Sequence, residues 1–242
     1  MRWAILGLAV ALAGCAVPPP QQQSGGTTTS APSRQQVQAR STEARADRAA
    51  SNFFNVITRV EPVAEQECRR RTGPGTNCDF AIVVDDRVEV PPNAFQTVSR
   101  DGRPVVGFTI SLIAEARNRD ELAFILGHEA AHHISGHLDR SQANAMSGAI
   151  LAGALATLGG AGPDAVRQAQ SLGATMGARR YSKGYELEAD ALGTVIAARA
   201  GYDPVVGAQY FARSPDPGNS FLGTHPPNSE RIATVRRIAA GL

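Results

Sequence analysis

Apolar residues recur along the chain with helical spacing in four long stretches and with strand-like spacing in three short ones. The helical stretches span residues 37–70, 120–137, 185–200 and 229–240. The strand-like stretches span 80–84, 94–98 and 105–110, and the last two flank Asp101-Gly102, a dipeptide typical of hairpin turns. This pattern predicts an α+β domain, mostly α, with one small sheet before the 120–137 helix.

Residues 141–163 carry no charge, which raises the question of a membrane span. Large apolar residues are few in this stretch, and the remainder is mostly Ala and Gly, which partition only weakly into lipid. We therefore expect a buried or membrane-facing helical hairpin, with a true transmembrane span as the alternative.

Length and charge limit the class of protein. With 242 residues, of which 43% are hydrophobic and 19% charged, the chain can bury one good core, so we expect one domain. The formal net charge of +2 is close to balance, which argues against a nucleic-acid partner held through phosphate contacts.

The N-terminus has the features of an export signal. Arg2 precedes an apolar run that is too short to span a bilayer and ends in Leu12-Ala13-Gly14-Cys15. This ending resembles the lipobox of bacterial lipoproteins, so we expect residues 1–14 to be a signal peptide and Cys15 to be lipidated. The alternative is an ordinary secretory signal in which Cys15 is incidental.

The segment after the signal reads as a spacer. Residues 15–36 are rich in Pro, Gln, Ser, Thr and Gly and predict a disordered tether, which leaves 37–242 as the folded domain. Ala16, rather than Asp, follows the cysteine, and by resemblance to the usual sorting rule this favours the outer membrane. The protein would then reach the membrane through an N-terminal lipid anchor.

The two remaining cysteines agree with export. Cys68 and Cys78 are separated by a polar, turn-rich segment, and an oxidising periplasm would join them in a disulfide. A metal site is the competing interpretation, but no histidine lies nearby in the sequence.

The strongest chemical signal is His128-Glu129-Ala130-Ala131-His132. On a helix, His128 and His132 project from one face about 6 Å apart at Cβ, which suits two corners of a zinc tetrahedron. Glu129 lies about 100° around the helix, near enough to take a proton from metal-bound water without binding the metal. Histidines on a solvated face are the alternative, which the apolar character of this helix disfavours. We expect one Zn²⁺ per chain.

A third ligand is sought in residues 181–190. Glu186 and Asp190 share one helix face, whereas Glu188 points about 160° away from Glu186. One carboxylate could therefore bind zinc while the other holds a ligand histidine in the required tautomer. An ordinary charged surface face is the alternative.

Together these stretches resemble the HtpX-type gluzincin metallopeptidases, which include the CAAX prenyl proteases and the BepA-like and LoiP-like proteins. The matching residues, in the family's order, are Asn93-Ala94-Phe95, the run 120–132, Glu186 with Ala189-Asp190, and Thr224-His225-Pro226 with Arg231-Ile232. The resemblance implies a zincin-type domain whose small sheet packs beside the His-Glu-x-x-His helix.

The resemblance also assigns roles to residues. It implies zinc ligands at His128, His132 and Glu186, a general base at Glu129, and an acid at Asp190 that supports a ligand. His225 would be either a displaceable fourth zinc ligand or a group that stabilises the oxyanion, in a loop that Arg231 could tie down. As an isolated residue, His225 would more often be a loop histidine with no such role. His133 and His137 lie off the ligand face, so we expect packing or hydrogen-bonding roles for them.

The expected function is that of a zinc endopeptidase of the bacterial envelope, on the periplasmic face of the outer membrane, as in LoiP-like lipoproteins. Unfolded or misassembled envelope proteins would bind as extended strands along residues 105–111 and be cleaved by Glu129-assisted attack of zinc-bound water. One alternative is a chaperone-like or scaffold lipoprotein of outer-membrane assembly with secondary proteolysis. Another is a purely structural zinc, which Glu129 disfavours because a closed site has no use for an adjacent base.

Overall fold

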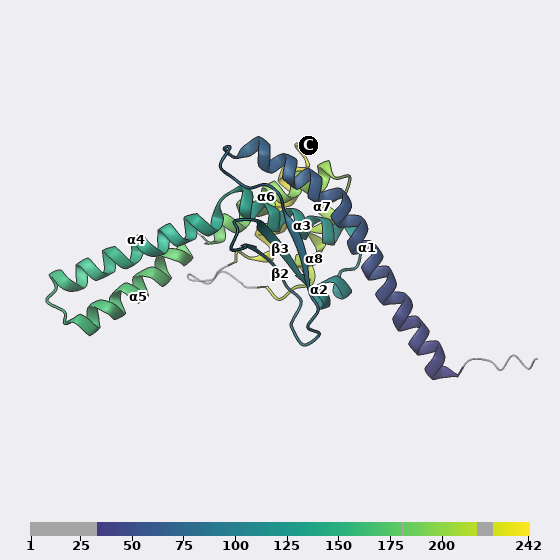
Figure 1. The fold of residues 1–242 in the computed structure, drawn as a ribbon, viewed down its shortest axis with the longest axis horizontal. Coiled ribbons are helices and arrows are strands. Elements are labelled where there is room, and N and C mark those ends of the chain that lie inside the picture. The colour runs from purple at the N-terminus through teal and green to yellow at the C-terminus, as the bar shows by residue number, and fades with distance from the viewer. Residues whose placement is uncertain (1–32, 181, 217–224) are drawn as a thin grey trace, which may run out of the picture. The chain divides into compact units, whose positions relative to one another are not determined.

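A computed structural model describes residues 33–180, 182–216 and 225–242 (Figure 1). Its elements are α1 (Arg34–Arg71), β1 (Ala81–Asp85), β2 (Ala94–Val98), β3 (Pro104–Thr109), α2 (Ile110–Glu115), α3 (Arg119–Ile134), α4 (His137–Leu158), α5 (Pro163–Arg180), α6 (Ser182–Arg199), α7 (Pro204–Gly207), α8 (Gln209–Arg213) and α9 (Asn228–Ala239). The fold class is α+β and mostly α, as predicted. The predicted signal peptide and Cys15 lie outside the described residues.

The three strands form one sheet in the order β1-β3-β2. The predicted β2–β3 hairpin is confirmed, and its turn places Gly102 at φ 83°, a left-handed conformation that glycine tolerates best. β1 joins the opposite edge of β3 in parallel. Because β3 is the middle strand, both of its edges are already paired, so the expectation that 105–111 receives a substrate strand is wrong.

The core lies between α1, the sheet and α3. Phe53 of α1 meets Phe108 of β3 edge to face, with ring centroids 5.0 Å apart. Cys68 and Cys78 are buried in the same core and form a disulfide, with their Cα atoms 5.7 Å apart. This confirms the predicted pair and contradicts a metal-binding role for these two cysteines.

The long helix predicted for 120–137 is in fact two helices. α3 begins after Asn118, whose side chain accepts a hydrogen bond from the Glu121 N–H at 2.9 Å. It ends at Ile134, and Gly136 adopts φ 63°, so the chain leaves the helical path before α4 begins at His137. The start of α4 therefore turns back toward the end of α3.

The uncharged stretch 141–163 forms most of α4 and the turn after it, and α5 packs beside α4 as the second arm of a hairpin (Figure 1). The prediction placed the whole hairpin inside 141–163 and missed α5. The expectation of burial is wrong for the large apolar residues of this stretch, which are exposed: Met146, Ile150, Leu151, Leu155 and Leu158. Among the described helices, none is long and apolar enough to cross a membrane, which contradicts the transmembrane alternative.

α3 and α6 pack against each other (Figure 1), and two glycines, one on each helix, lie at the contact. A Cβ on Gly193 would lie 2.8 Å from the backbone nitrogen of His128, and a Cβ on Gly127 would lie 2.9 Å from the carbonyl oxygen of Gly193. Both obstacles are backbone atoms, which cannot move aside as a side chain can. The two helices can pack this closely only with glycine at both positions.

We predict that Gly193→Ala forces α3 and α6 apart and lowers the free energy of unfolding by about 1–3 kcal/mol, the usual effect of overpacking. Gly184→Ala is the matched control on the same helix, because nothing lies within 4 Å of a Cβ there. Urea denaturation of both variants measures the difference. Equal stability of the two would contradict the close contact.

Candidate metal centre

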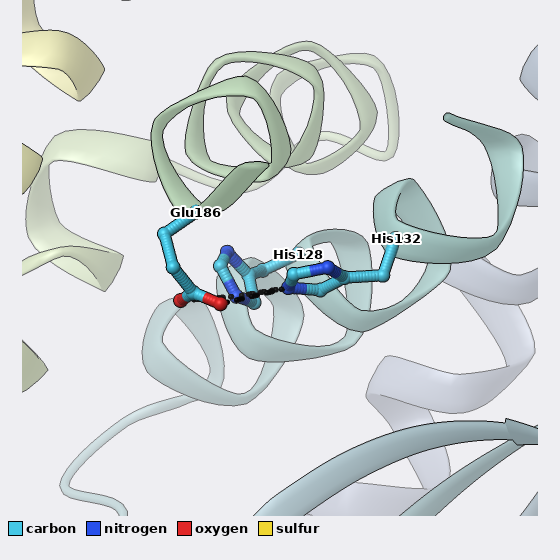
Figure 2. Close-up of side chains that lie close together, drawn as sticks. All are labelled: His128, His132 and Glu186. Atoms are coloured by element: carbon cyan, nitrogen blue, oxygen red, sulfur yellow. Dashed lines mark hydrogen bonds and ion pairs between the residues drawn. The ribbon is translucent and has the colours of Figure 1, made fainter. Parts of the chain in front are cut away.

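Three side chains predicted as metal ligands meet at the α3–α6 contact (Figure 2). His128 and His132 lie one turn apart on α3, and Glu186 reaches them from α6 (Figure 2). His128 Nε2 is 3.0 Å from His132 Nε2 and 3.5 Å from Glu186 Oε2, and His132 Nε2 is 3.4 Å from Glu186 Oε1. The helix contact thus brings together residues more than fifty positions apart.

These separations fit a tetrahedral ion. Zinc bound at about 2.0–2.1 Å from imidazole nitrogens and carboxylate oxygens places neighbouring ligand atoms roughly 3.3 Å apart. The three observed separations of 3.0, 3.5 and 3.4 Å bracket that value. Two imidazoles and one carboxylate are also the ligand set of open zinc sites that keep a position for water or substrate. The residues present therefore fit the metal that the sequence predicts.

His128 is oriented from behind by two buried charged groups. Its Nδ1 lies 2.9 Å from Asp190 Oδ1, so the proton sits on Nδ1 and leaves Nε2 for a metal. Arg231 in turn donates from Nε and Nη2 to both Asp190 oxygens, at 2.8 and 2.7 Å. Arg231 also packs against Phe211, with its guanidinium carbon 3.7 Å from the ring centroid. The structure thus brings Asp190 and Arg231 to the site.

Protonation of the two histidines differs in the metal-free protein. Burial lowers the pKa of His128, but the Asp190 and Glu186 carboxylates outweigh it and raise that pKa to about 9. Burial and the neighbouring His128 charge lower the pKa of His132 to about 3. Burial raises the pKa of Glu186, yet the hydrogen bonds from His128 and His225 hold it below its ordinary value. A metal would therefore displace a proton from His128, so its affinity rises with pH.

Glu129 lies between the ligand histidines in sequence but not among the ligand atoms. Its side chain lines a cavity of about 610 Å³ together with His128, His132 and Glu186. Burial raises the pKa of Glu129, and the nearby Glu186 charge acts in the same direction. A carboxylate with a raised pKa is a better proton acceptor, as a general base requires.

A second cavity of about 240 Å³ shares Glu129, His132 and Glu186 with the first. β2 borders both: Ala94 lines the first cavity and Gln96 the second. The ligand group therefore lies where two hollows meet, beside one strand of the sheet.

His225 also reaches the site. Its Nδ1 is 3.1 Å from Glu186 Oε2, and its side chain is 53% exposed at the edge of the larger cavity. It contacts the ligand carboxylate without joining the three atoms that could hold the ion.

The other two histidines of the run make hydrogen bonds, as expected. His133 Nε2 lies 2.7 Å from the Asn77 carbonyl, away from the ligands. His137, however, returns to the site, because its Nδ1 is 2.9 Å from His132 Nδ1 while its Nε2 is 3.2 Å from Glu188 Oε2. Sequence spacing missed the pair of His137 and Glu188, since the first lies beyond a helix break and the second points away from Glu186.

We predict that Asp190→Asn weakens zinc binding about 10–100-fold, because the amide lacks the negative charge that makes His128 a stronger ligand. Competition with a chromophoric chelator measures the Kd. Asp164→Asn on α5 is the matched control, because that carboxylate is paired with Arg167 at the surface. An Asp190→Asn protein that binds zinc as tightly as the control would argue against this support.

Known proteins resemble this chain in sequence. The model of peptidase family M48 matches residues 55–239, most of the chain. A Vibrio cholerae protein named "Putative beta-barrel assembly-enhancing protease" is 34% identical over 142 residues, and the "Mitochondrial metalloendopeptidase OMA1" of Arabidopsis thaliana is 30% identical over 131 residues. These matches cover 53% and 52% of this chain but only 29% and 26% of the two relatives. The chain belongs to peptidase family M48, a family of metallopeptidases.

Proposed function

We propose that this protein is a zinc-dependent endopeptidase of the bacterial cell envelope. The observation that carries the proposal is the group of His128, His132 and Glu186, whose ligand atoms all lie within 4.8 Å of one another, with Glu129 beside them in the same cavity. A purely structural ion would need neither an adjacent carboxylate with a raised pKa nor an open cavity at the ligands.

Peptide hydrolysis requires that a proton be removed from the attacking water and that a proton be delivered to the amide nitrogen. When bound, zinc supplies Lewis acidity, which polarises the attacking water and the scissile carbonyl. A Glu129 carboxylate oxygen takes a proton from the attacking water while the water oxygen bonds to the carbonyl carbon. Glu129 then gives that proton to the amide nitrogen as the C–N bond breaks, which restores the carboxylate and releases an acid and an amine.

The open edge of β2 offers a place for the substrate main chain. Asn93 and Ser99, which flank β2, both hydrogen-bond across to the β3 side. Antiparallel pairing alternates, so the N–H and C=O groups of Ala94 and Gln96 face the opposite edge. No other strand of the described sheet pairs with that edge. An extended peptide added there would run past both cavities.

Recognition through such an edge depends on main-chain hydrogen bonds and so requires an extended segment. Gln96 adds a side-chain acceptor, because its buried Oε1 has no partner among the described residues. We infer that the substrates are unfolded or misassembled envelope proteins, which expose extended segments. Folded proteins present few such segments.

The proposed location is the periplasmic face of the outer membrane. It is supported by the lipobox-like sequence ending at Cys15, which would anchor the protein through lipid, and by the disulfide of an oxidising compartment. The Vibrio cholerae relative named for β-barrel assembly agrees with an envelope role.

We predict that Glu129→Gln lowers cleavage of an unfolded protein such as casein by at least about a hundredfold, because only the proton acceptor is lost. Zinc content and melting temperature should stay at the wild-type values. Glu43→Gln, on the exposed face of α1, is the control and should cleave normally. A Glu129→Gln protein with more than a tenth of wild-type activity would contradict the peptidase mechanism. A wild-type protein that holds zinc but cleaves no unfolded protein would favour a chaperone or scaffold role instead.

We further infer that His225 stabilises the oxyanion, since it lines the substrate cavity but stands outside the group of ligand atoms. His225→Ala should lower kcat about a hundredfold with zinc retained, the usual loss for one oxyanion donor. Turnover and metal content are measured on the same sample. Raised basal cleavage with weaker zinc binding would show that His225 is a displaceable fourth ligand.

A further inference from the structure

His132, like His128, has a hydrogen-bonding partner behind the ligand group. The partner of His128 is a carboxylate, whereas the partner of His132 is another histidine. His132 faces His128 and Glu186 with Nε2, so its other ring nitrogen, Nδ1, points away from the ligand group. That Nδ1 lies 2.9 Å from Nδ1 of His137, which is 4% exposed. The two rings stand edge to face, with centroids 4.9 Å apart.

The position of each proton along this contact follows from the ligand role. A metal on Nε2 of His132 requires the proton on Nδ1, which then donates to Nδ1 of His137. His137 must accept there and so carries its own proton on Nε2. That Nε2 lies 3.2 Å from Glu188 Oε2, a suitable acceptor. One tautomer of each ring therefore satisfies both hydrogen bonds, the one from His132 to His137 and the one from His137 to Glu188.

Glu188 and His137 are themselves fixed in place. Arg140 donates to Glu188 Oε2 at 2.9 Å, which orients the carboxylate. The Tyr185 ring stacks on His137, with centroids 4.7 Å apart and planes 15° apart. The guanidinium carbon of Arg140 also lies over the Tyr185 ring, 4.3 Å from its centroid. His137 is thus held on its face by an aromatic ring and at its edge by a carboxylate.

Three acidic residues of α6 contact the two ligand histidines in different ways. Glu186 belongs to the ligand group, Asp190 contacts His128 directly, and Glu188 reaches His132 through His137. The left-handed Gly136 makes this possible, because it returns the first residue of α4 to the end of α3.

We propose that His137 and Glu188 are positioning residues that hold His132 in the tautomer and orientation required for zinc, as Asp190 does for His128. This rests on the proposed function, since it takes zinc as the ion bound at Nε2. The competing explanation is packing alone: His137 fills space against Tyr185, and its nitrogens are incidental.

Two substitutions at one position separate these explanations. His137→Phe keeps a ring against Tyr185 but removes both nitrogens. His137→Asn removes the ring but places an amide oxygen where Nδ1 was, and asparagine is tolerated at the start of a helix. His133→Phe is the matched control, because His133 bonds to the Asn77 carbonyl instead of to a ligand.

Zinc affinity by chelator competition is the first measurement. His137→Phe should bind zinc about 10–100-fold more weakly than wild type, the usual effect of losing the partner of a ligand histidine. His137→Asn should recover most of that loss, and His133→Phe should stay within about threefold of wild type. Glu188→Ala should weaken binding about three- to tenfold, less than His137→Phe, because water can replace a half-exposed carboxylate.

Two further measurements report on the ligand itself. With cobalt in place of zinc, the visible absorption bands should shift in His137→Phe and not in His133→Phe. At saturating zinc, His137→Phe should lower kcat by a larger factor than it raises KM, because the main-chain groups of β2 that would bind the substrate are unchanged although His137 lines the cavity beside them.

Wild-type affinity in both His137→Phe and Glu188→Ala would overturn the proposal, as would an Asn variant no better than Phe. If His137→Phe fails to fold, Glu188→Ala at the surface still tests the contact. A wild-type protein that binds no zinc, or a Glu129→Gln variant that cleaves as fast as wild type, would instead refute the proposed function. The two failures are therefore distinguishable.

Discussion

The close approach of α3 and α6 at Gly127 and Gly193 is the constraint on which the rest of the site depends. The gap between the helices is so small that a single methyl group on Gly193 would meet backbone atoms of His128. At this separation Glu186 can reach both histidines, and Asp190, one turn further along α6, lies against His128 at 2.9 Å. Wider helix packing would place these carboxylates out of hydrogen-bonding range, and the ligand atoms would no longer meet.

The same contact buries several charged groups, which is costly unless each is paired. Asp190 and Arg231 are both buried, and they form a two-pronged pair while Asp190 also meets His128. Burial alone would raise the pKa of Asp190, yet the Arg231 and His128 contacts hold it below its ordinary value. Pairing therefore outweighs desolvation here, and the network keeps the ligand histidine in one orientation before any ion binds.

Local sequence patterns predicted the elements that depend on local physics. The 94–98 strand, the hairpin turn and the helix carrying His128 and His132 follow from periodicity and turn chemistry, and the disulfide from cysteine spacing and export. Parallel pairing of β1 with β3 joins segments some twenty residues apart, so no local signal places β3 in the middle. The contact of His137 with His132 was not predicted for another reason. Helical spacing no longer tells which residues share a face once Gly136 leaves the right-handed region. Which residues carry the chemistry was thus easier to predict than what holds them.

His128 is held by a carboxylate and His132 by a neutral imidazole, and this difference follows from charge balance in a buried site. Glu129, Glu186 and Asp190 bring three carboxylates to the site, and Arg231 together with a bound divalent ion would compensate three negative charges in full. A carboxylate placed directly against His132 would add an unbalanced negative charge close to Glu129 and would raise the pKa of Glu129 further. His137 supports His132 without adding a charge, and it transfers the contact to Glu188, where Arg140 and solvent neutralise the carboxylate at little cost. A neutral imidazole between ligand and carboxylate therefore orients the second histidine while leaving Glu129 able to lose and regain its proton.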